Sequence, residues 1–301
     1  MYYVVGMSAK TLESRYAEVD GLRLHHLAGG TGPPLVLVHG LGGSASNWAE
    51  LAPLLARRFR LLVPDLAGHG RSEPPRSVSR LDDFAGHVGA LMELENMQSA
   101  PVIGHSLGGT VALRLAAQRP EAVPALVLAA PAGITSSTNR FATLISIVVI
   151  ARPGRLVSPF RGAVAASALL RYPTFGWWQV SDPRALSARA VDGFLEGPGL
   201  HRDIATAGRA LIGYDPRLEL ERVHCPVLLL WGARDRLVPL EDGYDFARRL
   251  RAPLRAIADC GHLLIGEQPE ACAAAIADFL DGVLDLDELA AEAEALRQVR
   301  S

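Results

Sequence analysis

The chain has 301 residues, of which 49% are apolar and 21% are charged, and this composition is typical of a globular protein with a sizeable core. The formal net charge of -2 argues against electrostatic capture of nucleic acid. The three cysteines, Cys225, Cys260 and Cys272, fit neither a zinc site nor a disulfide framework, so we expect buried thiols.

The first ten residues (MYYVVGMSAK) lack a basic start followed by a long apolar stretch, so we expect no signal peptide and a cytoplasmic protein. Beyond them, Ser14–Val19 and Leu22–Ala28 alternate between apolar and polar residues on either side of Asp20-Gly21. Asp-Gly supplies the positive φ angles that a two-residue hairpin turn needs. The sequence therefore predicts a β-hairpin.

Four apolar runs then follow, and each is typical of a strand buried on both faces of a parallel sheet. These runs are Leu35–Val38, Arg60–Pro64, Pro101–Gly104 and Ala125–Ala129. Helical patterns at Asn47–Arg57, Leu81–Met97 and Thr110–Gln118 separate them. Alternating strands and helices indicate an α/β fold, in which a parallel sheet has helices on both faces.

The alternation stops at about residues 133–216, where helical stretches punctuated by prolines replace the strands. Within this insertion, Phe141–Ala151 is apolar almost all round, so we expect it to be buried or to line an apolar cleft. The run is shorter than the roughly 20 residues that a membrane-spanning helix needs, so we expect no membrane span.

The α/β alternation then resumes with strands at Pro226–Trp231 and Leu254–Ala258 and with helices near Asp242–Leu250 and at Pro269–Leu280. We therefore predict one discontinuous core, made of residues 1–132 and 217–301, and a helical cap at 133–216. The tail, residues 281–301, is rich in Ala, Glu and Leu and predicts a helix. This helix either packs on the surface of the core or forms an oligomer contact.

Residues 104–108 (GHSLG) match the pattern G-x-S-x-G between a predicted buried strand and a predicted helix. A serine on such a sharp turn has a strained backbone, so its neighbours must be nearly free of side chains, as Gly104, Gly108 and Gly109 are. The turn lifts the Ser106 hydroxyl clear of the sheet and places a helix N-terminus beneath it. We predict that Ser106 is a catalytic nucleophile, the alternative being a tight turn without chemistry.

A serine hydroxyl needs an adjacent base at neutral pH. Among nine histidines, His262 follows the last predicted strand, where a loop leaves the carboxyl edge of the sheet. Asp235 follows the preceding strand, whereas the rival position at Ala130–Gly133 offers no carboxylate. We therefore predict His262 as the general base and Asp235 as the group that orients it. The histidines that we interpret as surface or packing residues are His25, His26, His87, His201 and His224.

The oxyanion that forms during acyl transfer needs preorganised hydrogen-bond donors. One predicted donor is the backbone N–H of Leu107, directly after the nucleophile. The second is expected in residues 39–43 (HGLGG), whose glycines let the backbone turn toward the substrate, and we assign it to the N–H of Leu41. We interpret His39 as a scaffold residue for this loop.

Six segments together resemble the α/β-hydrolase fold family. They are HGLGG (39–43), WAEL (48–51), DLAGHGRS (65–72), GHSLGG (104–109), GARDRLVP (232–239) and GHLLIGEQPE (261–270). The resemblance covers Val19 to about Leu280. It implies a mostly parallel eight-stranded sheet with helices on both faces and a helical lid over the active site, here at about 133–216.

The resemblance also separates subfamilies. Haloalkane dehalogenases and epoxide hydrolases use an aspartate where this chain has Ser106, so both activities are disfavoured. Carbon–carbon hydrolases of aromatic ring degradation use serine, but many carry a tryptophan and an asparagine where this chain has Leu263 and His105. Haloperoxidase-like members commonly have a much shorter chain, so short-chain carboxylesterases and lactonases fit best.

We therefore expect a serine hydrolase that cleaves carboxylic ester bonds of small to medium apolar substrates through an acyl-enzyme. A carbon–carbon hydrolase of ring-cleavage products and a lactonase are the enzymatic alternatives, and a non-catalytic small-molecule receptor is the third. HGLGG lacks the Lys-Ser/Thr of a P-loop, and no metal-ligand cluster has useful spacing, so we expect no cofactor and no metal. We expect a monomer or homodimer.

Substrate contacts are expected from Gly40 and His105 beside the nucleophile and from Trp177 and Trp178 in the lid. The two tryptophans belong to an aromatic cluster with Tyr172 and Phe175. This cluster either lines an acyl or aryl pocket or packs the interior of the lid.

Overall fold

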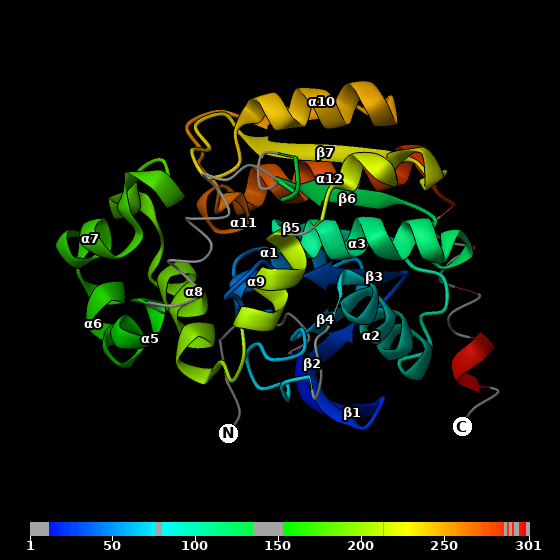
Figure 1. Cartoon of the computed structure of the whole chain (residues 1–301), viewed down its shortest axis with the longest axis horizontal. Coiled ribbons are helices and arrows are strands. Elements are labelled where there is room, and N and C mark those ends of the chain that lie inside the picture. Colours follow the sequence, from blue (N-terminus) through cyan, green and yellow to red (C-terminus); the bar gives the residue numbers. More distant parts are fainter. Residues whose placement is uncertain are drawn as a thin grey trace.

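The computed structural model describes residues 12–75, 80–134, 153–212 and 214–285 and, in the tail, residues 288, 291 and 295–298 (Figure 1). The apolar run Phe141–Ala151, about half of the predicted tail helix and the side chain of Trp177 lie outside the described part.

Eight strands form one sheet in the order β1-β2-β4-β3-β5-β6-β7-β8. Their bounds are β1 Glu13–Val19, β2 Leu22–Gly30, β3 Pro34–Val38, β4 Arg60–Pro64, β5 Val102–His105, β6 Leu126–Ala129, β7 Val227–Gly232 and β8 Leu254–Ile257. The pairs β1–β2 and β2–β4 are antiparallel, and all other neighbouring strands are parallel. The predicted mostly parallel sheet is therefore confirmed, and so is the hairpin, in which Val19 pairs with Leu22.

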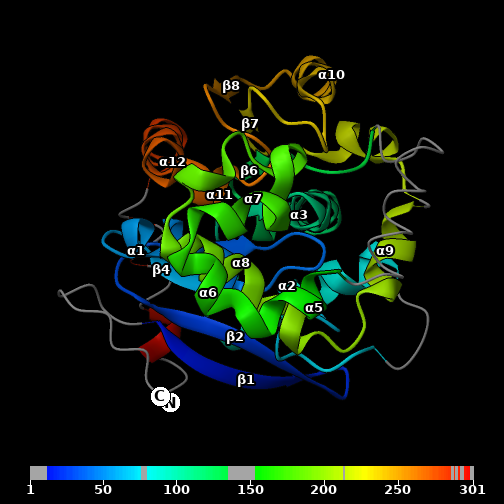
Figure 2. The same ribbon diagram turned by 90° about the vertical axis from the view of Figure 1, so that its left-hand side faces the viewer.

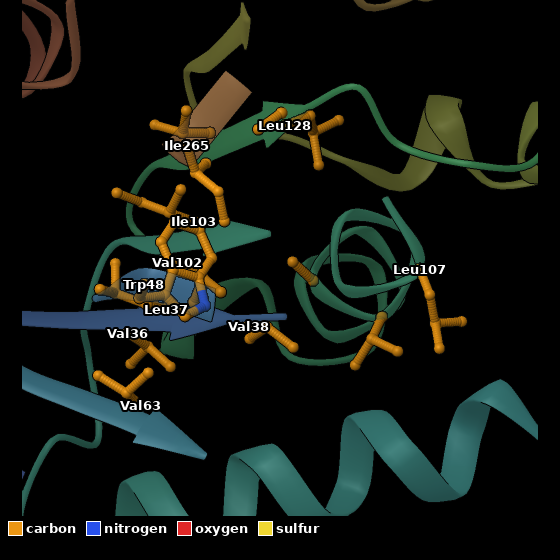
Figure 3. Packing of buried hydrophobic residues seen from close by; sticks show 14 of the residues in the cluster. Val36, Leu37, Val38, Trp48, Val63, Val102, Ile103, Leu107, Leu128 and Ile265 are labelled. Atoms are coloured by element: carbon orange, nitrogen blue, oxygen red, sulfur yellow. The ribbon is translucent and has the colours of Figure 1, made fainter. Parts of the chain in front are cut away.

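Helices cover both faces of the sheet. Figure 2 shows α1 (Leu51–Leu55) and α12 (Pro269–Val283) on one side, with α2 (Leu81–Leu94), α3 (Leu107–Gln118) and α10 (Leu240–Leu250) on the other. Strands β3, β4, β5 and β6 are buried along their whole length, because both faces are covered. Figure 3 shows side chains of β3 and β5 packed beside Trp48, with Ile265 and Leu128 next to them.

The helix predicted at Asn47–Arg57 is divided in the structure. A 3-10 turn at Ala45–Trp48 precedes α1, which begins only at Leu51. Pro53 has no N–H, so a helix that began at residue 47 would lack a hydrogen bond in its interior. A helix that starts at Leu51 has this proline in its first turn, where a backbone N–H has no partner within the helix in any case.

The chain between β6 and β7 is helical wherever the structure describes regular elements. The helices are α5 Pro153–Val157, α6 Arg161–Ala166, α7 Ala168–Gln179, α8 Ala188–Leu200 and α9 Ala205–Ile212. Helices α5 to α8 lie together at one end of the molecule, on the left in Figure 1 and in front in Figure 2. Across the described ranges, every helix is too short or too polar to span a bilayer.

Candidate active site

Ser106 lies between β5 and α3 in a conformation that few residues other than glycine adopt. Its φ of 54° and ψ of -120° place it at a sharp turn, which costs on the order of 1–3 kcal/mol of backbone strain. The flanking glycines permit this turn. A Cβ on Gly104 would lie 2.2 Å from the Gly108 carbonyl oxygen, and a Cβ on Gly108 would lie 2.1 Å from that of Val38. The strand and the helix can approach this closely only without these side chains.

His262 and Asp235 form a buried hydrogen-bonded pair. Asp235 follows β7 and His262 follows β8, so both leave the carboxyl edge of the sheet, as Ser106 does from β5. His262 Nδ1 lies 2.7 Å from Asp235 Oδ2. The other carboxylate oxygen of Asp235 accepts hydrogen bonds of 2.9 Å from the N–H groups of Leu237 and Val238. The carboxylate is therefore held in place independently of the histidine.

The fixed carboxylate determines how the histidine is oriented. A carboxylate can only accept, so Nδ1 of His262 carries the proton and Nε2 is left as the acceptor. Within the described part of the chain, no hydrogen bond joins the Ser106 hydroxyl to His262 in this conformation. In ligand-free enzymes such catalytic hydrogen bonds are often long and tighten only with substrate.

His105 is almost fully buried beneath His262, although we expected it to contact substrate. Its Nε2 lies 2.8 Å from the backbone oxygen of His262 and so donates to it, and the two rings are 4.9 Å apart. Burial, followed by the neighbouring His262, lowers the pKa of His105 to about 3. The side chain is therefore a neutral support beneath the histidine loop, and its contact with substrate stays a prediction.

The predicted oxyanion loop, residues 39–43, lies directly against Ser106. A Cβ on Gly40 would be 3.1 Å from the Cβ of Ser106. The loop is a tight turn, because the N–H of Gly43 donates to the oxygen of Gly40 at 3.0 Å and Gly42 has a φ of +70°. Leu41, the second predicted donor, is in the middle of this turn, and Leu107 begins α3.

His39 supports this loop from below. Leu66 donates its N–H to His39 Nε2, so Nδ1 carries the ring proton and donates to the oxygen of Gly40 at 2.8 Å. Burial lowers the pKa of His39, which favours the neutral ring that this arrangement requires. The geometry supports our interpretation of His39 as a scaffold residue.

Asp65 connects three segments around this loop. Its carboxylate accepts hydrogen bonds from the N–H groups of Ala45 and Arg71 and pairs with His25 Nδ1 at 2.7 Å. Burial alone would raise the pKa of Asp65, but the hydrogen bond and charge of His25 outweigh it and hold the pKa below its ordinary value. Sequence reasoning quoted Asp65 only as part of the segment DLAGHGRS, without giving it a role.

The helical insertion contacts the loop that carries His262. The N–H of His262 donates to the oxygen of Gln179 at 2.8 Å, and a Cβ on Gly261 would be only 2.7 Å from Val180 Cα. Glu267 accepts from the N–H groups of Gly261 and Ser181, and burial raises the pKa of its carboxyl. The insertion therefore helps to hold the loop that carries His262, a role that sequence reasoning missed.

The aromatic cluster of the insertion is divided in the structure. Phe175 is buried and packs edge-to-face against Phe194, so it belongs to the interior of the insertion. Tyr172 and Trp178 are 51% and 42% exposed. The backbone of Gly176, with a φ of 60°, breaks α7, and a Cβ there would clash with the indole ring of Trp178. The exposure of Trp178 does not favour a closed pocket around it.

No group of three or more His, Cys, Asp or Glu side chains in the described ranges is arranged to hold a metal ion. What the arrangement can do is acyl transfer. It places a serine at a strained turn, a histidine with a fixed tautomer and a glycine-rich loop at one edge of the sheet.

Known proteins with similar sequences and structures identify the family. The model of the alpha/beta hydrolase fold family matches residues 33–269. A Caulobacter protein provisionally named a carbamate hydrolase, RutD, is 32% identical over 275 residues, which cover 88% of this chain and 97% of that protein. The acetyltransferase component of the acetoin cleaving system of Cupriavidus necator is 30% identical over 83% of this chain, which spans only 64% of that relative's length.

Among solved structures, a membrane phospholipase A described as a bacterial virulence factor superposes with a TM-score of 0.67. It is 25% identical, and the match covers 90% of this chain and 86% of that one. The family model alone covers more than half of the chain, and the sheet has the mostly parallel eight-stranded topology that the resemblance implied. The chain therefore belongs to the alpha/beta hydrolase fold family.

Proposed function

We propose that this hydrolase cleaves carboxylic ester bonds of small to medium apolar substrates through an acyl-enzyme on Ser106. The observation that carries the proposal is the buried Asp235–His262 pair at the same sheet edge as the strained turn of Ser106. Activation of a serine requires a histidine that is held by a carboxylate and has a nitrogen available to accept a proton. Asp235 accepts three hydrogen bonds, one of them from His262, and Nε2 of His262 is the acceptor.

In the first half of the reaction, Nε2 of His262 accepts the proton of the Ser106 hydroxyl as its oxygen attacks the ester carbonyl. The N–H groups of Leu41 and Leu107 stabilise the oxyanion, and each such donor contributes about 10²–10³ in rate. The tetrahedral intermediate collapses as the imidazolium gives its proton to the departing alcohol. The carbonyl carbon is then bonded to the serine oxygen.

In the second half, water attacks the acyl-enzyme and gives its proton to His262. The intermediate releases the carboxylic acid, and the proton returns to the oxygen of Ser106. Asp235 keeps the proton on Nδ1 throughout and stabilises the imidazolium, without being protonated itself. The proposed cycle requires only these side chains, the backbone donors and water.

We propose residues 133–216 as a cap that bounds the entrance to this site and sets its specificity. The backbone contacts of Gln179 and Ser181 with the loop of His262 support this division. Carbamate hydrolysis is a second candidate, because the Caulobacter relative is provisionally named for it and a carbamate presents the same carbonyl to the serine.

The test is a substrate panel assayed with the wild-type protein and with Ser106→Ala. It comprises p-nitrophenyl acetate, butyrate and octanoate, an aryl carbamate and a vinylogous diketone of the ring-cleavage type. We expect ester turnover that the alanine variant loses. Turnover of the carbamate or the diketone alone would replace the ester proposal, and inertness toward the whole panel would end it.

A further inference from the structure

We propose that His201, which lies just after α8 in the helical insertion, is a positioning residue that fixes the oxyanion loop. The inference rests on the proposed function, because it assigns His201 a role in the acyl-transfer step. Sequence reasoning interpreted His201 as a surface or packing residue. The structure instead places its imidazole between the loop of residues 39–43 and the loop of residues 65–72.

The hydrogen bonds of His201 determine its tautomer. The N–H of Gly70 donates to Nδ1 at 3.1 Å, so Nδ1 is an acceptor and the ring proton is on Nε2. Nε2 lies 2.6 Å from the carbonyl oxygen of Gly42 and therefore donates to it. One imidazole thus joins the loop of residues 65–72 to the oxyanion loop of residues 39–43.

This contact completes a symmetrical support of the oxyanion loop. His39 Nδ1 donates to the oxygen of Gly40, and His201 Nε2 donates to the oxygen of Gly42. Leu41, whose N–H is the proposed oxyanion donor, lies between these two carbonyl groups. With both carbonyls fixed, the direction of the intervening N–H is also restricted, as electrostatic preorganisation requires.

Contacts of the neighbouring residues and of the ring itself hold His201 in place. The N–H groups of Arg202 and Asp203 both donate to the oxygen of Gly68 at 3.1 Å. Gly68 has a φ of +79°, and a Cβ on it would be 2.1 Å from the oxygen of Asp203. The ring also packs edge-on against His69, with 5.4 Å between the ring centroids. The insertion is therefore anchored directly beside its contact with Gly42.

A second close contact joins the end of α8 to the oxyanion loop. A Cβ on Gly197, in the last turn of α8, would lie 2.8 Å from Ser44 Oγ and 3.1 Å from the carbonyl carbon of Gly43. The end of α8 thus lies against the end of the oxyanion loop. We therefore expect a shift of the insertion at this point to move the Gly42 carbonyl and, with it, the turn that contains Leu41.

Two substitutions separate the two hydrogen bonds of His201. In His201→Gln, the amide nitrogen can reach the place of Nε2 and keep the donor to Gly42. In His201→Asn, the shorter side chain places its oxygen near Nδ1 and keeps only the acceptor for Gly70. His224→Asn, at an exposed histidine before β7, is the matched control.

We expect His201→Asn to lower kcat for p-nitrophenyl butyrate by about 10- to 100-fold with little change in KM. This loss is smaller than that from removing an oxyanion donor, because the N–H of Leu41 is displaced and not deleted. The rate of inactivation by a fluorophosphonate, which also builds negative charge on an oxygen in this position, should fall in parallel. His201→Gln should recover most of both rates. Thermal melting of both variants and a crystal structure of His201→Asn show whether the fold is kept and whether residues 40–43 move.

Equal kcat values for the Gln and Asn variants, or a loss confined to KM, would overturn the role of His201 while leaving the ester proposal intact. An unmoved loop in the crystal structure of a slow His201→Asn variant would overturn it as well. A wild-type protein that neither turns over the ester nor reacts with the fluorophosphonate would instead remove the proposed function. The two failures are therefore distinguishable.

Discussion

Replacing Asp235 with asparagine should almost abolish catalysis while sparing most of the fold. The asparagine oxygen can still accept the N–H groups of Leu237 and Val238, which bond to Oδ1 in the native protein. Its NH₂ group then faces Nδ1 of His262, where the native structure has an acceptor at 2.7 Å. Two donors cannot share a hydrogen bond, so the imidazole must move its proton to Nε2.

That tautomer cannot take the proton of Ser106. By analogy with the same substitution in other serine triads, kcat should fall about 10⁴-fold, equivalent to roughly 5.4 kcal/mol of activation free energy. The cost in folding stability should be much smaller, because two of the three acceptor contacts remain. Asp235→Ala removes all three and should cost about 1–3 kcal/mol for each backbone N–H left without a partner.

Steady-state hydrolysis of p-nitrophenyl butyrate gives kcat, and urea unfolding gives the free energy of unfolding. Asp259→Asn is the control, because Asp259 is an exposed carboxylate between β8 and His262 that pairs with Arg234. We expect it to stay within about twofold of the wild type, since surface ion pairs contribute little. An Asp235→Asn variant within tenfold of the wild-type kcat would refute the tautomer argument.

Two further predictions concern stability. Gly108→Ala should fail to fold or lose several kcal/mol of stability, because its Cβ would lie 2.1 Å from the oxygen of Val38. Gly86→Ala has open space around its Cβ in α2 and should raise the free energy of unfolding by about 0.5–1 kcal/mol. Equal unfolding midpoints for the two variants would contradict this prediction. Burial lowers the pKa of His105 to about 3, so as the pH falls the unfolded chain is protonated at this residue before the folded protein is. The free energy of unfolding should therefore fall as pH drops from about 6.5 toward 3, by up to about 1.4 kcal/mol per pH unit. His105→Gln should make this loss shallower in urea unfolding series, and parallel curves would count against the assignment.

The central strands of the sheet could be predicted because they are buried on both faces. Runs such as Leu35–Val38 and Leu61–Pro64 are continuously apolar, and in the structure their side chains are buried under helices on each side. Ser106, Asp235 and His262 could be selected because carboxyl ends of parallel strands meet at one edge, which makes position after a strand informative. The Asp235–His262 hydrogen bond is consistent with that selection.

The contacts of the insertion could not be predicted in the same way. His201 has no periodic or motif context, and its partners Gly42 and Gly70 are 159 and 131 residues distant in sequence. Glu267 lies in a recognised segment, but its bond to Ser181 depends on how the insertion returns to the core. The aromatic residues of α7 had suitable composition for a pocket, yet composition does not distinguish the buried Phe175 from the exposed Trp178.

The central claim is that Ser106 becomes covalently acylated with the help of His262. The most direct test is peptide-level mass spectrometry after reaction with diethyl p-nitrophenyl phosphate, which leaves a stable adduct on an activated serine. We predict one phosphoryl group per chain, located on the peptide that contains Ser106, and formed far more slowly in His262→Ala. An adduct on any other residue, or one that forms at the wild-type rate without His262, would contradict the account.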